Sequence, residues 1–252
     1  MIDTKKYKTR YVLAIAILLL LVISGSVFLL TQAKGSKSNS PATPTAPAPM
    51  TVTPTSTPTI EEAKQPLFFD DFTGISKGWY LGNVAGYART ISNNTLILAD
   101  ANHKILIESL PTNAVFTDFS ITTTFTLIQG DAGDSVGLYL RGDSNLDHDY
   151  RLDVYGNNTY AISKEYLDTN KASQVQYLVT PTTSTTLEPE GQQNTITIMM
   201  KGSQFVLQIN GKVLNSLNDT DYTSGQIALF VQNSDTSSGV KASFSSISVY
   251  PA

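Results

Sequence analysis

Residues 194–231, NTITIMMKGSQFVLQINGKVLNSLNDTDYTSGQIALFV, carry the pattern that decides the fold. Apolar residues alternate with polar ones, as at Ile196, Ile198 and Met200. A period of two is typical of antiparallel strands with one buried face and one face in water. Asn210-Gly211 lies between two such runs, and this dipeptide is the strongest short-range hairpin signal. The stretch therefore predicts paired antiparallel strands.

The same alternation occurs upstream of this stretch. Residues 115–128, VFTDFSITTTFTLI, predict a strand whose buried face carries Val115, Phe119, Ile121, Phe125 and Leu127. Residues 155–160, YGNNTY, predict a second hairpin. Many short strands, without a convincing amphipathic helix after residue 66, are typical of a sandwich or jelly roll. We therefore expect one all-β domain, a two-sheet jelly-roll sandwich, over residues 67–252.

An apolar segment precedes this domain. Residues 11–30, YVLAIAILLLLVISGSVFLL, contain no charged residue, and a helix of that length spans about 30 Å of hydrocarbon. The basic residues before the segment should remain in the cytoplasm: Lys5, Lys6, Lys8 and Arg10. We expect a cytoplasmic tail over residues 1–10, a transmembrane helix over 11–30, and a single-pass cell-membrane protein with an extracellular C-terminal domain.

A cleaved signal peptide is the alternative for residues 11–30. The apolar run is longer than the roughly 7–15 residues usual in signal peptides, and the following TQAKGSK is a poor cleavage site. Both features favour an uncleaved anchor. Residues 31–66 are rich in proline, threonine and serine and have little apolar surface to bury. They predict a disordered linker between the membrane and the domain.

Composition excludes several classes of function. The 252 residues include no cysteine, which rules out a disulfide scaffold, a thiolate zinc site and a cysteine nucleophile. The net charge of −4 is unevenly distributed, because residues 67–252 carry ten basic and eighteen acidic residues. An acidic domain argues against a nucleic-acid partner and makes an anionic polymer less suitable than a neutral glycan or another surface polymer.

Polar and aromatic side chains alternate with apolar ones on two adjacent predicted strands. We expect them to share one sheet face and to bind a ligand: Tyr139, Arg141, Asp149, Arg151, Asp153 and Tyr155. Sugars bind to such mixtures because their C–H faces stack on aromatic rings and their hydroxyls pair with charged groups. The alternative is a solvated sheet face held by cross-strand ion pairs.

The same residues do not form a recognisable catalytic pair. Glycosidases need two carboxyl groups about 5–9.5 Å apart, whereas Asp149 and Asp153 would lie about 13 Å apart along one strand. Two closer pairs of carboxyl groups are also unsuitable. In the pair of Asp147 and Asp149, Asp147 lies in a predicted turn. Glu165 and Asp168 form an isolated, turn-like pair. We therefore assign no catalytic residue and favour a protein that is not an enzyme.

A structural calcium ion is the only cofactor that the sequence leaves open. Acidic residues gather in two predicted loops: Asp131, Asp134, Asp143, Asp147 and Asp149. Calcium takes six to eight oxygen ligands, but loop aspartates are equally turn formers, and the spacing of an EF-hand is absent. The two histidines, His103 and His148, have no third ligand for zinc. We assign no metal ligand and no cofactor.

Three segments carry a family resemblance. The segments are LFFDDFTGISKGWY (67–80), VGLYLRGDSNLDHDYRLDVYGNNTYAISKE (136–165) and FSSISVY (244–250). Together with the stretch quoted first, they resemble concanavalin A-like and laminin-G-like jelly-roll domains. These include extracellular 3-keto-disaccharide hydrolase-like domains of bacteria, non-catalytic sugar-binding modules and adhesion modules. The chain departs at Ser245 and Ser246, where the family pattern carries aspartate, which weakens the calcium site that the resemblance implies.

We therefore expect a membrane-anchored extracellular domain that binds carbohydrate, or another surface polymer, without cleaving it. The resemblance leaves two alternatives of different classes. One is a hydrolase of sugar derivatives, and the other is a structural or adhesion module with a protein partner.

Overall fold

The computed structural model describes residues 64–74 and 77–252, and this part of the chain forms fifteen strands and no helix. The strands are β1 (Phe68–Asp70), β2 (Gly82–Val84), β3 (Tyr87–Ser92), β4 (Thr95–Asp100), β5 (Ile105–Ser109), β6 (Phe119–Gln129), β7 (Ser135–Gly142), β8 (Asp149–Tyr155), β9 (Thr159–Leu167), β10 (Ser173–Thr183), β11 (Gln193–Lys201), β12 (Gln204–Ile209), β13 (Lys212–Asn218), β14 (Gln226–Gln232) and β15 (Val240–Pro251).

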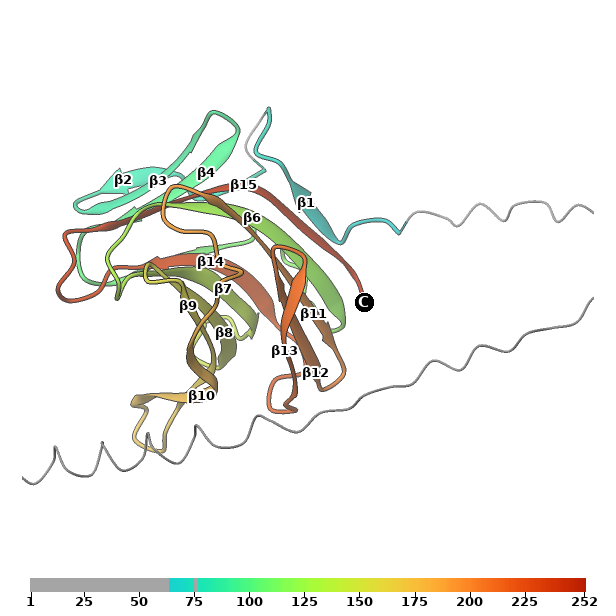
Figure 1. The fold of residues 1–252 in the computed structure, drawn as a ribbon. Helices are drawn as coiled ribbons and strands as arrows, with labels where there is room; N and C mark the ends of the chain where they lie inside the picture. Colours follow the sequence, from blue (N-terminus) through green and yellow to red (C-terminus); the bar gives the residue numbers. More distant parts are fainter. Residues whose placement is uncertain (1–63, 75–76) are drawn as a thin grey trace, which may run out of the picture. The chain divides into compact units, whose positions relative to one another are not determined.

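The strands form two antiparallel sheets. The nine-stranded sheet has the order β13-β12-β11-β6-β15-β4-β3-β2, with β1 also paired to β15. The six-stranded sheet has the order β10-β9-β8-β7-β14-β5. Figure 1 shows the two sheets as curved layers, with the nine-stranded sheet on the outside of the curve. The predicted all-β, two-sheet jelly-roll sandwich is therefore confirmed.

The core lies between the sheets and follows the predicted alternation. Along β6 the buried residues alternate with Thr and Ser, and Thr122 and Thr124 pair with threonines of β11 across the outer face at 3.0 and 3.1 Å. Cross-strand threonine pairs of this kind stabilise a solvated sheet face. The prediction for Val115 is wrong, because the residue precedes β6 and is 66% exposed, while the neighbouring Phe116 is buried.

Both predicted hairpins are present. Asn210 and Gly211 connect β12 to β13 with φ angles of 50° and 78°, as a tight hairpin turn with two left-handed residues requires. Gly156, Asn157 and Asn158 connect β8 to β9. The second turn sets the register of β8 against β9, and that register positions the candidate site.

A β-bulge at Arg141 interrupts the alternation of β7. Gly142 pairs with Gln226 and Leu140 with Ile227, so Arg141 has no partner opposite it on β14. The φ angle of Arg141 is 52°, a left-handed conformation that is uncommon for residues other than glycine. The bulge re-aims the Arg141 side chain, with consequences for the site described below.

The predicted cytoplasmic tail, transmembrane helix and most of the predicted linker, residues 1–63, lie outside the described residues. Within residues 64–74 and 77–252, no helix is long and apolar enough to cross a bilayer.

Candidate functional site

The site lies on the face of the six-stranded sheet that points away from the core. Here Tyr139, Ala228 and Phe230 form a small apolar cluster that is separate from the main core. Gly137 makes room for the Phe230 ring, because a Cβ at this position would come within 2.8 Å of that ring and 1.8 Å of the Leu152 carbonyl oxygen. The tight packing supports the polar residues of β8.

Arg151 is the centre of the polar part of this face, with only 7% of its surface exposed. Its guanidinium donates to Asp153 Oδ1 at 2.6 Å and to Glu165 Oε1 at 3.0 Å, and it also donates to Gln232 Oε1. The same group lies 4.4 Å from the centroid of the Phe230 ring. Arg151 is therefore held by charges on two strands and by an aromatic face.

Burial alone would lower the pKa of Arg151, but the negative charges of Asp153 and Glu165 outweigh burial and raise this pKa above its ordinary value. Asp153 also accepts a hydrogen bond from Ser135 Oγ at 2.7 Å. The guanidinium thus stays charged and fixed in one orientation, as a preorganised binding group must.

A cleft opens beside Arg151, and we call it the Arg151 cleft. Its volume is about 180 Å³, and its lining residues are Arg151, Asp153, Tyr155, Ser163, Glu165, Val175, Tyr177 and Gln232. Val175 and Tyr177, both on the edge strand β10, are 52% and 48% exposed. The cleft therefore combines fixed charges at its floor with an accessible aromatic ring at its rim.

Asp149 lies opposite Glu165 in the register of β8 and β9 and is fully buried. Neither of its carboxylate oxygens has a hydrogen-bond partner. Burial, and secondly the negative charge of Glu165, raise the pKa of Asp149 to about 8. Asp149 is therefore largely protonated at neutral pH. The neutral form is the one of lower free energy for a buried carboxyl group without a partner.

We expect the Asp149→Asn variant to gain stability relative to the wild-type protein as pH rises. Between about pH 4 and pH 8 folded Asp149 holds a proton that the unfolded chain loses, so its titration lowers the free energy of unfolding by up to about 1.4 kcal/mol per pH unit. Urea unfolding followed by the fluorescence of Trp79, the only tryptophan, measures this. Exposed Asp235→Asn is the matched control, and a wild-type pH profile for Asp149→Asn would contradict the assignment.

Five of the six residues predicted to bind a ligand meet on this face: Tyr139, Asp149, Arg151, Asp153 and Tyr155. The phenol of Tyr139 accepts a hydrogen bond from Arg151 at 3.3 Å, and Tyr155 lines the cleft. Tyr139 and Asp149 are buried beneath the surface and do not line the cleft. They support the face from below.

Arg141 does not lie with the other five residues. The prediction that Arg141 shares a sheet face with Tyr139 is therefore wrong. Its guanidinium donates to the carbonyl oxygens of Thr117 at 2.6 Å and Gly202 at 2.9 Å, and to that of Tyr222 at 3.1 Å. The physical reason is the bulge, which shifts the alternation by one residue. Arg141 connects three loops.

The sequence-based interpretation missed five residues of the cleft: Ser163, Glu165, Val175, Tyr177 and Gln232. Glu165 is not part of a turn with Asp168, as expected, but lies within β9 and binds Arg151. The alternation of Tyr160 and Ile162 with smaller or polar residues was a signal that the strand continues to this point. No local signal identifies Gln232 and Tyr177, because they come from other strands.

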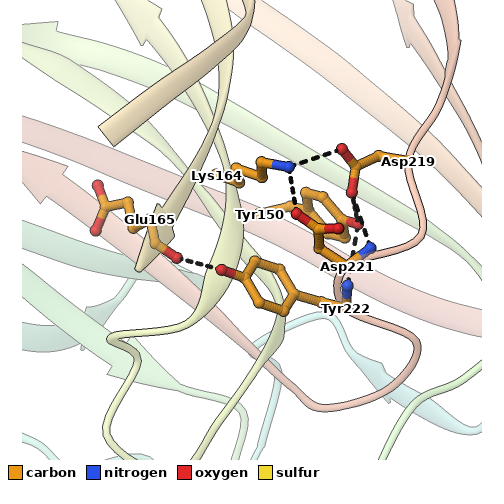
Figure 2. A network of polar contacts seen from close by, with 6 residues as sticks. All are labelled: Tyr150, Lys164, Glu165, Asp219, Asp221 and Tyr222. Atoms are coloured by element: carbon orange, nitrogen blue, oxygen red, sulfur yellow. Dashed lines mark hydrogen bonds and ion pairs between the residues drawn. The ribbon is translucent and has the colours of Figure 1, made fainter. Parts of the chain in front are cut away.

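A second polar network holds the β13–β14 loop against β8 and β9, as Figure 2 shows. Lys164 donates to Asp219 Oδ2 at 3.1 Å and also to Asp221, while Tyr150 donates to Asp219 Oδ1 at 2.6 Å. Tyr222 donates to the main-chain oxygen of Glu165 at 2.7 Å. The network thereby fixes the backbone of Glu165, whose side chain points to Arg151.

The acidic residues considered for calcium do not converge on one site. In the part of the chain that the structure describes, one group brings three possible ligands within 4.8 Å of one another, namely Asp143, Asp147 and His148. Asp134 instead accepts hydrogen bonds from Ser234, Ser237 and the backbone of Asp131. His148 contacts Asp147 at 2.7 Å, and Asp143 accepts backbone N–H groups of Asn145 and Asp147, so the group has the contacts of a hydrogen-bonded turn.

Solved structures with the same fold are numerous, at low sequence identity. The carbohydrate binding module CBM66 from Bacillus subtilis matches with a TM-score of 0.50 and 18% identity, over 69% of this chain and 95% of that one. A glycoside hydrolase family 16 endo-glucanase from Bacteroides ovatus has a TM-score of 0.54 and 11% identity, over 73% and 99%. A protein with a galectin-like fold from Bacillus subtilis has a TM-score of 0.54 and 13% identity, over 74% and 96%.

These likenesses establish the fold. No curated protein was found to match the chain in sequence. The sequence profile of the 3-keto-alpha-glucoside-1,2-lyase-like domain matches residues 66–249, which is most of the chain and nearly all of the jelly roll. The resemblance inferred from the sequence segments is thereby confirmed, and the chain belongs to the 3-keto-alpha-glucoside-1,2-lyase-like domain family.

Proposed function

We propose that the chain is a membrane-anchored extracellular protein whose jelly-roll domain binds a neutral carbohydrate without cleaving it. The Arg151 cleft is the observation that carries this proposal. The Arg151 guanidinium holds Asp153, Glu165 and Gln232 in place. The two carboxylates keep free lone pairs and the Gln232 amide keeps its N–H donors for sugar hydroxyls, while Tyr177 offers a ring for a sugar face.

The charges of the cleft favour a neutral ligand. Arg151 is already paired with both Asp153 and Glu165, so its positive charge is compensated before any ligand arrives. An anionic sugar would meet the excess of carboxylate charge in the cleft. The acidic excess of residues 67–252 acts in the same direction.

The carboxyl groups support binding without catalysis. A glycosidase requires a protonated acid beside the scissile bond. Asp149 has the raised pKa that suits an acid, but its side chain is fully buried and does not line the cleft. The two carboxylates that do line the cleft are engaged by Arg151. The family name keeps a sugar-derivative hydrolase as the alternative, which turnover of a 3-keto-disaccharide would favour.

Residues 11–30 and 31–66 complete the proposal. An uncharged segment of twenty residues with a basic N-terminal flank anchors the chain, and the linker rich in proline and threonine carries the domain outward. A protease applied to intact cells should then release the jelly roll into the medium.

Glycan-array binding by the full chain in mild detergent tests the proposed ligand class. We expect neutral oligosaccharides to bind and anionic ones to bind less well. Tyr177→Ala should weaken binding about tenfold or more, because it removes the accessible ring at the rim of the cleft. Tyr250→Ala is the matched control, since Tyr250 is 37% exposed and lies on the other sheet.

Two results would contradict the proposal. One is an array on which no glycan binds above background. The other is unchanged glycan binding by both Tyr177→Ala and Arg151→Lys.

A further inference from the structure

A second pocket adjoins the Arg151 cleft. Its volume is about 620 Å³, and its lining includes Tyr87, His103, Lys104, Ile105, Gln232 and Asp235. We call it the His103 pocket. Gln232 lines both cavities, and it accepts a hydrogen bond from Arg151. The two cavities therefore meet at this side chain.

Ile105, which lines the His103 pocket, lies on the same sheet face as the Arg151 cleft. Ile105 lies opposite Gln232 in the register of β5 and β14. It also packs against the apolar cluster of Tyr139 and Phe230 beneath the cleft. The binding face thus continues across β14 onto β5, the edge strand of the six-stranded sheet.

The walls of the His103 pocket are held by buried polar contacts. Asn233 accepts the backbone N–H of His103 at 2.9 Å, and the Asn233 backbone donates to the Lys104 carbonyl at 2.9 Å. Fully buried Asp134 accepts the backbone N–H of Ser234 at 2.7 Å. The two loops that form the pocket are therefore fixed before any ligand binds, which lowers the entropic cost of binding.

The pocket offers groups that suit sugar hydroxyls. His103 Nδ1 lies 2.7 Å from the Ser234 carbonyl oxygen, so Nδ1 donates its proton there and Nε2 is left without this partner for a sugar hydroxyl. Lys104 and Asp235 are exposed and of opposite charge, so their charges offset each other in the pocket. Tyr87 adds an aromatic ring that is half-buried against the core.

We propose that the His103 pocket is a second carbohydrate subsite, and that the ligand is a chain of neutral sugar units lying across the strands. The inference rests on the proposed function and names its substrate class. Tyr177 on β10 and Ile105 on β5 are separated by five strand spacings of about 4.8 Å, or roughly 24 Å, which exceeds a single sugar ring. A chain of several units reaches both cavities.

The test is binding of the full chain to arrayed neutral glucans, xylans, mannans, galactans and fructans, each supplied from the monosaccharide to the hexasaccharide. For the best-bound series we expect affinity to rise with length up to several units. His103→Ala and Asp235→Ala should each weaken binding of the hexasaccharide about tenfold and leave binding of the shortest bound sugar unchanged. His148→Ala, the change of the other histidine, is the matched control.

The outcomes separate this inference from the proposed function. If affinity does not depend on length and both variants bind like the wild-type protein, the second subsite is wrong while glycan binding stands. If no member of any series binds, the proposed function and this inference both fail. Both variants change exposed side chains, so Trp79 fluorescence should show unaltered folding.

Discussion

Arg151→Met should lower the free energy of unfolding by about 3–5 kcal/mol, because it removes one partner from a buried ionic network. Asp153, which is only 3% exposed, would lose the cation that compensates its burial. Glu165 would lose the same partner. The contact of the guanidinium with the Phe230 ring would also be lost.

Denaturant unfolding followed by Trp79 fluorescence measures the effect. Trp79 is buried and donates to Asp70 at 2.8 Å, so its emission reports the integrity of the jelly roll. Arg151→Lys retains the positive charge but not the planar set of N–H donors. Its decrease in the free energy of unfolding should therefore be smaller than that of Arg151→Met. A decrease below about 1 kcal/mol for Arg151→Met, the usual size for an exposed ion pair, would contradict the described network.

Arg141→Met should be the second most destabilising change and should lower the free energy of unfolding by about 3 kcal/mol or more. The carbonyl oxygens of Thr117, Gly202 and Tyr222 would lose their charged donor, and a hydrogen bond to a charged group contributes about 1.5–3 kcal/mol. The side chain is 2% exposed, so water does not replace it readily. Urea unfolding of the purified variant measures the loss.

The same variant separates two interpretations of Arg141. If Arg141 were a ligand contact, as the alternation predicts, the variant would lose glycan binding and keep its stability. The structure leads to the opposite expectation, because the guanidinium is directed to loop carbonyls away from the cleft. Lys212→Met, which changes an exposed basic residue on β13, should alter stability by less than about 0.5 kcal/mol.

Much of the fold could be predicted because it depends on local patterns. The alternation in 194–209 and the Asn210-Gly211 turn specify strands and a hairpin without reference to the rest of the chain. The family could be recognised from longer segments that contain the same alternation and turns. On β8, alternation also placed Asp149, Arg151 and Asp153 on one face, because that strand has no bulge.

The remaining features of the site depend on pairing between distant strands. Glu165 lies opposite Asp149 because the β8–β9 turn sets that register, and Gln232 reaches Arg151 although they are 81 residues apart. Burial of Asp149, which raises its pKa, is likewise a property of the packed sheet. None of these relations is encoded in a short window of sequence.

The amino-acid sequence by itself determined the fold class, the two hairpins and the polar face of β8, because side-chain direction in a strand alternates with every residue. Only the tertiary structure decided which polar residues form the cleft. One bulge removes Arg141 from the face, and cross-strand register brings Glu165, Tyr177 and Gln232 to it. Register and bulges are set by contacts between strands far apart in the chain, so alternation within one strand does not reveal them.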